Sequence, residues 1–420
     1  MLLLRREHNT CVPQCRTKGD AVADDDSSSS DSFTETTSEG WFSRLGGAIK
    51  GVLLGMVLAI AAFPLLFWNE GRAVRTAKSL AEGRGAVVTV SSERVDPANE
   101  GKLVHTTGRA KTADTVADPV FGVADKALRL KRKVEMYQWK ETSKSEKREK
   151  VGGSTETTTT YSYSQEWSEA LIDSSRFKQG SGHQNPQSMP QKSAQWNAAK
   201  VTVGGYTLSP SQVERIGGDE PLSVAGVRPK ADLGRPVREH AGGFYAGANP
   251  DAPRVGDLRI TFTRVGETDV TVVAKQAGAS FEPYRAKAGS TVDLQRSGIA
   301  SADEMFSSAE ASNVTLTWIL RAAGLALMVI GIGLFLRPLS VLASVLPILG
   351  DIVGAGTGLI ALLLGGLLSV VTIAIAWIAY RPLLGIGLLV VAGGLAYGAV
   401  HLVRKARASR PLTSAAAASR

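Results

Sequence analysis

The feature that most constrains this chain is the concentration of its apolar residues in two separate blocks. Residues 51–68 are eighteen successive uncharged residues, and a second apolar block runs from 314 to 403. An α-helix rises about 1.5 Å per residue, so the segment 46–68 is long enough to cross about 30 Å of hydrocarbon. Residues 69–313, between the blocks, are polar and rich in turn-forming residues. We therefore predict an integral membrane protein that carries a large polar domain.

A cleaved signal peptide is the alternative interpretation of 46–68. A signal peptide has a shorter apolar core, and a cleavage site with small residues follows it. Here Phe67 and Trp68 end the apolar run, as aromatic residues do at a membrane interface. We favour a retained transmembrane helix.

The second block is interrupted twice by an Arg-Pro dipeptide. This block predicts three further spans, which are 314–336, 352–380 and 383–403. The segment 339–351 is too short to span, and we expect it to be interfacial or re-entrant. Arg321 lies about one turn inside the first of these spans, and we expect its side chain to extend to the interface. The predicted fold class is a multi-pass α-helical membrane protein with four transmembrane helices and a β-rich (α+β) domain between the first two.

Four spans return the C-terminus to the side of the N-terminus. The tail 404–420 contains Arg404, Lys405, Arg407 and Arg410, and positive charge marks the cytoplasmic side. The domain 69–313 is then expected outside the cytoplasm.

The N-terminal residues 1–40 predict a disordered tail, because an acidic and serine-rich run has little apolar surface to bury. The two cysteines of the chain, Cys11 and Cys15, lie in this tail. The polar domain therefore has no disulfide. The pair could bind a metal or carry an acyl chain, but a second pair of ligands is missing, and we expect neither a metal nor another cofactor.

The polar domain is expected to be β-rich, with short alternating stretches between turn residues from 85 to 298. The segment 134–167 predicts a long hairpin, because Gly152-Gly153 favours a two-residue turn. Strand pairing about this turn would place Trp139 opposite Glu166. The charged tip is expected in water, where it could also contact a partner. Residues 69–80 predict an amphipathic helix that either packs on the domain or lies on lipid headgroups.

A loop rich in Gly, Asn and Pro contains His183, Asn185 and Pro186. We expect a structural connection there, although an exported hydrolase could use such a loop. The sequence has five histidines without a second ligand at metal-binding spacing, and it lacks the phosphate-loop and nucleophile-elbow motifs. The net charge of +9 is dispersed along the chain, so we expect no nucleic-acid partner.

Several stretches resemble the transmembrane protein 43 family, also called LUMA. They are FPLLFWNEGRAVRTAKSL, MYQWKE, WSEALIDSSRF with GHQNPQSMP, VTVGGYTLS, and RPLSVLASVLPILGDIV with AWIAYRPL. The resemblance extends from about residue 41 to 403. It singles out motif positions of unknown role: Asn69, Glu70, Gly71, Arg72, His183, Asn185, Pro186, Asp351, Arg381 and Pro382.

The resemblance implies four transmembrane helices and a non-enzymatic role in organising membrane protein complexes, with self-association. In animals it implies the endoplasmic reticulum and inner nuclear membrane. The Gly, Ala and Arg-rich composition favours a bacterial member, so we expect the bacterial inner membrane and a scaffolding or membrane-maintaining role there. The expected partners are the lipid bilayer, other membrane proteins and a second copy of the chain. A channel or transport component built from the C-terminal helices is the alternative function.

Overall fold

The computed structural model describes residues 31–230, 232–383, 386, 387 and 390. Cys11 and Cys15, most of the expected span 383–403 and the tail 404–420 lie outside the described residues. The expected order of a helix, a β-rich region and further helices is confirmed.

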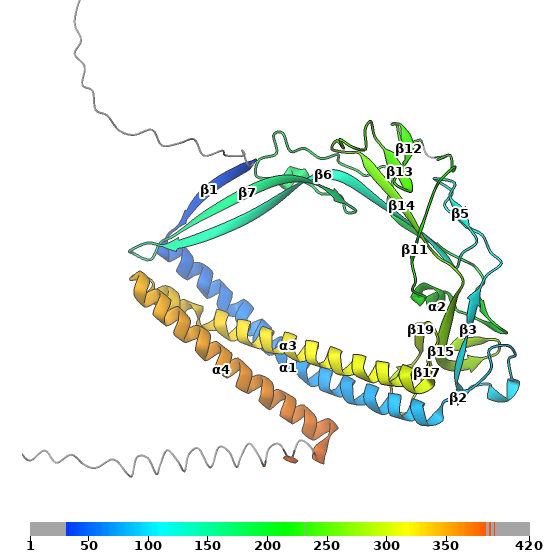
Figure 1. The fold of residues 1–420 in the computed structure, drawn as a ribbon. Coiled ribbons are helices and arrows are strands. Elements are labelled where there is room, and N and C mark those ends of the chain that lie inside the picture. Colours follow the sequence, from blue (N-terminus) through cyan, green and yellow to red (C-terminus); the bar gives the residue numbers. More distant parts are fainter. Residues whose placement is uncertain (1–30, 231, 384–385, 388–389, 391–420) are drawn as a thin grey trace, which may run out of the picture.

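Three long helices lie together along one side of the molecule, and the strands form the other side (Figure 1). The helices are α1 (Trp41–Ala86), α3 (Ala302–Ala343) and α4 (Pro347–Tyr380). Each is long and apolar enough to cross a membrane, and the described residues contain these three candidates. The sequence predicted an apolar segment in each of them.

Helix α1 has 46 residues and continues without a break through the expected juxtamembrane helix 69–80. A helix of this length measures about 69 Å, more than twice the thickness of the hydrocarbon. Its C-terminal part buries Ala73, Val74 and Leu80. This segment packs against the protein, as one of the two interpretations of 69–80 predicted.

Glycines allow the helix axes to approach closely. A Cβ on Gly55 of α1 would lie 2.6 Å from the carbonyl oxygen of Gly331 on α3, and a Cβ on Gly365 of α4 would lie 2.8 Å from Cγ2 of Val329. Small residues at such crossings let membrane helices pack backbone to backbone. Gly366, in contrast, has nothing within 4 Å. Only some of the glycines in the C-terminal block therefore serve helix packing.

The residues 339–351, which the sequence predicted to be interfacial or re-entrant, are divided between two helices. Helix α3 continues through Pro338 to Ala343, and α4 begins at Pro347. A proline can be accommodated inside a membrane helix when its surroundings satisfy the freed backbone groups. The connection between α3 and α4 is therefore a tight turn.

The β-rich region that the sequence predicted consists mostly of two sheets. The first sheet has the order β1-β7-β6-β14-β13-β12, with β11 beside β14 and β8 beside β6. Its strands are β1 (Ser32–Glu39), β6 (Arg129–Glu149), β7 (Thr155–Ser168), β8 (Ala194–Asn197), β11 (Glu220–Leu222), β12 (Val237–His240), β13 (Gly243–Ala246) and β14 (Leu258–Val265).

The second sheet has the order β19-β15-β16-β10-β9-β3-β2, with β15 also beside β3. Its strands are β2 (Val88–Thr89), β3 (Leu103–Lys111), β9 (Thr202–Val203), β10 (Tyr206–Thr207), β15 (Thr268–Ala277), β16 (Ser280–Glu282) and β19 (Leu294–Ser297). Smaller elements are the pairs β4 (Val116–Ala117) with β5 (Ala124–Asp125) and β17 (Tyr284–Arg285) with β18 (Thr291–Val292), the helix α2 (Pro210–Arg215), and 3₁₀ turns at Pro97–Asn99 and Ser174–Arg176.

Alternate residues of both sheets share one apolar core, which includes Leu130 of β6, Ile260 of β14 and Val272 of β15. A second apolar cluster joins this domain to the helices, with Leu80 of α1 and Phe306 of α3 packed beside Val273. Burial of this kind contributes about 25 cal/mol per Å² of apolar surface. The ends of α1 and α3 are therefore part of the fold of the β-rich region.

The hairpin of β6 and β7 is present, but its register differs by one residue from the prediction. Trp139 pairs with Gln165 instead of Glu166. The backbone N–H of Lys150 donates to the carbonyl of Ser154, so the loop has three residues where the prediction assumed two. Both Gly152 and Gly153 have positive φ, which glycine adopts without strain.

The last residues of the expected disordered tail form a strand instead. Strand β1 pairs antiparallel with β7 over its whole length, and the ring of Phe33 lies 6.2 Å from that of Tyr161. The threonine-rich edge of β7 offers unpaired backbone groups, and the threonines and Phe33 of β1 have high β-propensity. Pairing thus outweighs the polar composition of this segment.

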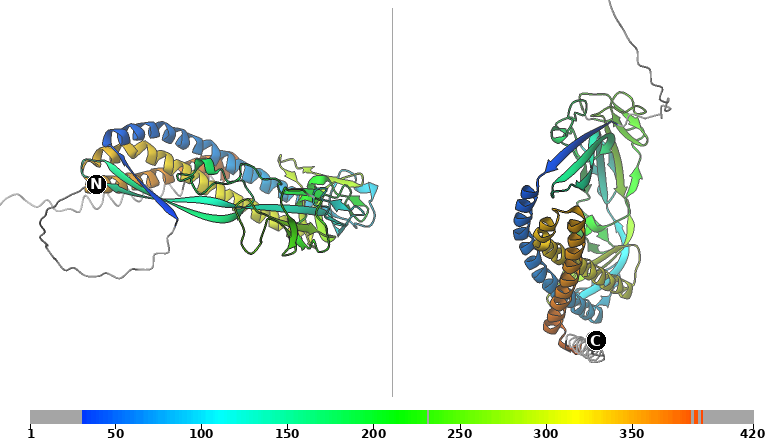
Figure 2. Two further views of the ribbon diagram at one scale, coloured as in Figure 1. Left: turned by 90° about the horizontal axis from the view of Figure 1, so that it is seen from above. Right: turned by 90° about the vertical axis from the view of Figure 1, so that its left-hand side faces the viewer.

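The tip of the hairpin, which the sequence predicted to lie in water, contacts the long helices, while the side chain of Val151 at the tip is 83% exposed. It meets the N-terminal end of α1 and the turn between α3 and α4 (Figures 1 and 2). The N–H of Gly152 donates to the carbonyl of Val345 at 3.0 Å, and Arg44 forms an ion pair with Glu149. The hairpin therefore joins the β-rich domain to the end of the bundle at which α1 begins.

We expect Gly365→Leu to lower the melting temperature of the detergent-purified protein, because overpacking against Val329 costs about 1–3 kcal/mol. Gly366→Leu is the matched control, since it makes the same change one residue later in open space. Tryptophan fluorescence during heating measures both variants. Equal melting temperatures for the two variants would contradict the described packing of α4 on α3.

Candidate functional site

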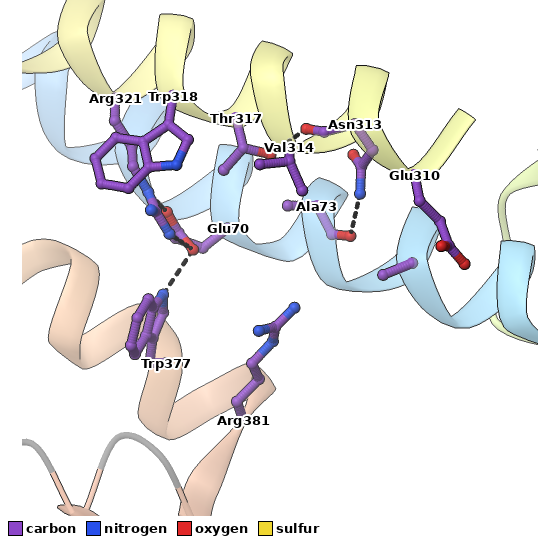
Figure 3. A pocket seen from close by; sticks show the side chains of 11 residues that line it. Glu70, Ala73, Glu310, Asn313, Val314, Thr317, Trp318, Arg321, Trp377 and Arg381 are labelled. Carbon is purple, nitrogen blue, oxygen red and sulfur yellow. Dashed lines mark hydrogen bonds and ion pairs between the residues drawn. The ribbon is translucent and has the colours of Figure 1, made fainter. Parts of the chain in front are cut away.

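A charged cluster lies where the three long helices meet (Figure 3). Arg321 of α3 forms a two-pronged ion pair with Glu70 of α1, with Nε to Oε1 at 2.6 Å and Nη2 to Oε2 at 2.9 Å. The indole Nε1 of Trp377 on α4 donates to the same carboxylate at 2.6 Å. One carboxylate therefore binds all three helices together.

This cluster is shielded from solvent. The side chain of Glu70 is 3% exposed and that of Arg321 is 17% exposed. The guanidinium carbon of Arg321 lies 4.8 Å from the ring centre of Trp318 and 5.5 Å from that of Trp377. Arginine on an aromatic face gains a cation–π attraction that is larger when water is excluded.

The side chain of Arg321, which the sequence predicted to extend to the interface, forms a shielded ion pair with a neighbouring helix. Leaving a charge unpaired in an apolar environment costs several kcal/mol, and a bidentate carboxylate removes most of that cost. The sequence did contain a signal. Glu70 lies just after the first apolar run and Arg321 lies near the start of the next run, so antiparallel helices bring the two charges to the same end of the bundle.

The neighbouring motif positions each contact a partner helix. Asn69 donates to the carbonyl of Thr317 at 3.1 Å. Arg72 donates to Asn313 at 2.9 Å and to the hydroxyl of Thr317 at 3.0 Å. These bonds join α1 to α3 just beyond the ion pair.

Gly71 faces α4 instead. A Cβ at this position would lie 2.6 Å from Cζ of Tyr380. The residues 69–72 thus fill one helical turn, in which Asn69 and Arg72 contact α3, Gly71 faces α4 and Glu70 contacts both helices. The sequence identified this turn, and it did not identify the partners on α3 and α4.

The other motif positions on α4 lie at its two ends. Arg381 follows the last residue of α4, and its side chain borders a cavity of about 290 Å³ beside the charged cluster (Figure 3). Pro382 is the next residue and is exposed. Asp351 is exposed near the start of α4, about 40 Å along the helix from Trp377. Arg381 thus joins the cluster, and Asp351 is remote from it.

His183 and Asn185 lie together at the base of the hairpin, away from the helices. The ring of His183 stacks on Tyr163 at 4.0 Å and meets Trp139 edge to face at 4.6 Å. Its Nδ1 contacts the carbonyl of Gln179 at 2.8 Å, and its Nε2 contacts Asp31 at 2.6 Å. Burial disfavours the charged ring, but these bonds outweigh burial and raise the pKa of His183 above its usual value.

Asn185 connects the loop to the hairpin backbone. Its side chain accepts from the N–H of Trp139 at 2.7 Å and donates to the carbonyls of Trp139 and Ile172. Pro186 lies beside Gly256. Because both ring nitrogens of His183 are engaged, the loop has the geometry of a structural connection.

No group of three or more His, Cys, Asp or Glu residues in the described part of the chain could hold a metal ion. The remaining buried ion pairs lie within the domain, as between Arg132 and Asp118 at 2.7 Å. The charged cluster of Glu70, Arg321 and Trp377 is accordingly the candidate site. Its arrangement fixes helices to one another, and it leaves a polar cavity open at one side.

Comparisons with known proteins agree on one family. A sequence model of a family described as Transmembrane protein 43 matches residues 136–382. Relatives named "Transmembrane protein 43" are 37% identical in Rattus norvegicus, over 83% of this chain and 89% of the relative, and 37% identical in Homo sapiens, over 82% and 88%. A "Transmembrane protein 43 homolog" of Drosophila melanogaster is 32% identical, over 80% and 90%. No solved structure matches.

We expect Glu70→Leu and Arg321→Leu each to destabilise the protein strongly, because each leaves one buried charge without its partner. Removing one partner of a buried ion pair costs about 3–5 kcal/mol of folding free energy. Glu70→Leu leaves Arg321 unpaired, and because Arg321 is partly exposed to solvent, we expect a cost in the lower part of this range. The double variant should lose less stability than the two single variants lose together, because it leaves no buried charge unpaired. Thermal unfolding of the four proteins in detergent measures this coupling.

The exposed pair of Lys144 and Glu146 supplies the control, because single and double substitutions there should leave the melting temperature unchanged. Strictly additive losses at Glu70 and Arg321 would show that the two charges do not depend on one another.

Proposed function

The chain belongs to the transmembrane protein 43 family, and from this premise we propose that it is a non-enzymatic membrane protein that organises other membrane proteins into complexes. The observation that carries the proposal is the long hairpin of β6 and β7, which projects from the β-rich domain beside the helices (Figure 1). A strand of 21 residues measures about 70 Å.

This hairpin offers an edge to a partner. Strand β14 covers one edge of β6 only at positions 129–136, and β7 covers the other edge from 136 to 149. The first edge has no strand partner at positions 141–149 within the described chain. An unpaired edge can accept a strand of another chain through backbone hydrogen bonds. The lysines and glutamates on it disfavour indiscriminate pairing.

The charged cluster also supports an organising role over catalysis. Glu70 is fully engaged by Arg321 and Trp377, and it holds the three long helices together. A transport role would need mobile or unpaired polar groups along the helices. The described helices instead pair Glu70 with Arg321 and Arg84 with Glu310 near their domain end.

We propose four transmembrane spans, the fourth within 383–403, with the β-rich domain outside the cytoplasm. We propose the inner membrane for a bacterial member, and the endoplasmic reticulum or inner nuclear membrane for a eukaryotic member. The large domain can then bring exported regions of other membrane proteins, or of a second copy, into contact.

This topology has a consequence for the hairpin tip. If 51–68 crosses the bilayer, the start of α1 lies on the side opposite to the domain. The polar hairpin cannot run through hydrocarbon, because its backbone edge and its charges would lose water. In a membrane the tip is therefore released from Arg44 and Val345, and strand β1 and Asp31, which precede α1, separate from β7 and His183. The outer edges of β6 and β7 then become accessible to a partner.

We expect Arg44→Cys with Glu149→Cys to crosslink in detergent and to lose this crosslink in native membranes, in a background of Cys11→Ser and Cys15→Ser. Arg44 and Glu149 form an ion pair at the hairpin tip, and membrane insertion separates them. Arg84→Cys with Glu310→Cys is the control, because this pair joins the domain ends of α1 and α3 and should crosslink under both conditions. Equal crosslinking of both pairs in membranes would contradict the proposed topology.

The organising role is tested by crosslinking in native membranes, followed by affinity purification. We expect the full chain to retain protein partners or a second copy, and a variant with 143–158 replaced by Asn-Gly to lose them. The control carries Lys144→Ser, Lys147→Ser and Arg148→Ser, which removes charge and keeps the backbone edge. A full chain that stays alone, or partners that survive the shortening, would refute the role of the hairpin.

A further inference from the structure

Two hollows meet at the charged cluster. The polar cavity of about 290 Å³ is lined by residues of all three helices and by Arg381. Beside it, α3 and α4 form an apolar groove of about 460 Å³. Trp318, Arg321 and Trp377 line both, so the two hollows adjoin (Figure 3).

The groove has the dimensions of one leaflet. Its walls on α4 extend from Leu367 to Ile378, which is about 16 Å along a helix. Half of a 30 Å hydrocarbon core is about 15 Å. Apart from Arg321 at its upper end, the groove is lined by aliphatic side chains and two indoles, among them Val370 and Val371. An acyl chain that enters beside Trp377 would reach the middle of the bilayer.

The polar cavity at the upper end has one cation in excess. Two carboxylates line it, and both are paired, Glu70 with Arg321 and Glu310 with Arg84 at 3.2 Å. The guanidinium of Arg381 makes no ion pair within the described part of the chain, and it extends toward the cavity (Figure 3). Arginine binds phosphate oxygens through paired charge-assisted hydrogen bonds.

An arginine at the end of an apolar groove that is as long as one membrane leaflet is thick is complementary to an anionic lipid. We propose that this site binds a single anionic phospholipid, with its phosphate on Arg381 and one acyl chain in the groove of α3 and α4. The indoles of Trp318 and Trp377 lie at the level where aromatic residues meet headgroups. This inference does not depend on the organising role, and it rests on the helices lying in a bilayer.

The test uses the full chain purified in detergent, to which phosphatidylglycerol or phosphatidylcholine is added. We expect phosphatidylglycerol to raise the melting temperature and native mass spectrometry to show one bound lipid. Arg381→Ala should weaken this binding about tenfold, because a charge-assisted hydrogen-bond pair is lost. Arg381→Lys should restore part of it, since the positive charge returns.

Matched variants separate the groove from the rest of the bundle. Val370→Trp fills the groove and should abolish lipid binding, whereas Leu362→Trp places the same side chain on α4 outside the groove and should have no effect. Arg337→Ala removes an exposed arginine at the opposite end of the helices and should also leave binding unchanged.

Four outcomes would overturn the proposal. Equal stabilisation by phosphatidylcholine would indicate non-specific lipid solvation, and stabilisation by inorganic phosphate alone would indicate a site for the free anion. Absence of bound lipid would mean that another part of this chain covers the groove. Loss of a dimer in Val370→Trp, without any change in lipid binding, would mean that a second copy covers it.

Discussion

The ion pair between Glu70 and Arg321 is the interaction on which the helix bundle depends. It joins two antiparallel helices at the point where they leave the apolar region, and Trp377 adds the third helix to the same carboxylate. A buried ion pair of this kind specifies how two helices are positioned relative to one another. An apolar helix can slide or rotate against another at little cost in free energy, whereas a buried carboxylate must lie next to its guanidinium. The close glycine contacts then fix the distance between the axes.

The apolar blocks and the alternating stretches were sufficient to predict long helices on either side of a β-rich region, because burial in lipid or in a core imposes a period on the sequence itself. The motif turn 69–72 was also visible in the sequence. Its partners were not, since Asn313 and Thr317 lie about 240 residues away and only the packed structure shows which face of α3 meets α1. The ion pair of Arg321 with Glu70 was not predicted, for the same reason.

Predictions from local sequence were wrong where contacts with distant parts of the chain determine the secondary structure. The polar composition of 32–39 predicts disorder, yet β1 forms because β7 presents an open edge. The two glycines at 152 and 153 predict a tight turn, yet the loop takes a third residue and shifts the register by one. At Pro338 a helix continues where a break was predicted, because α3 is held on both sides by α1 and α4.

The uninterrupted helix α1 gives the molecule a mechanical property. Its residues 69–86 extend about 27 Å beyond the apolar segment and end in the cluster of Leu80 and Phe306 that closes the β-rich domain. Pro64 lies inside α1 before this segment, so residues 69–86 form a lever arm that is attached to the domain. If the bilayer became thinner and α1 tilted by about 10°, its far end would move by about 5 Å, so membrane thickness would be read out as a displacement of the whole domain.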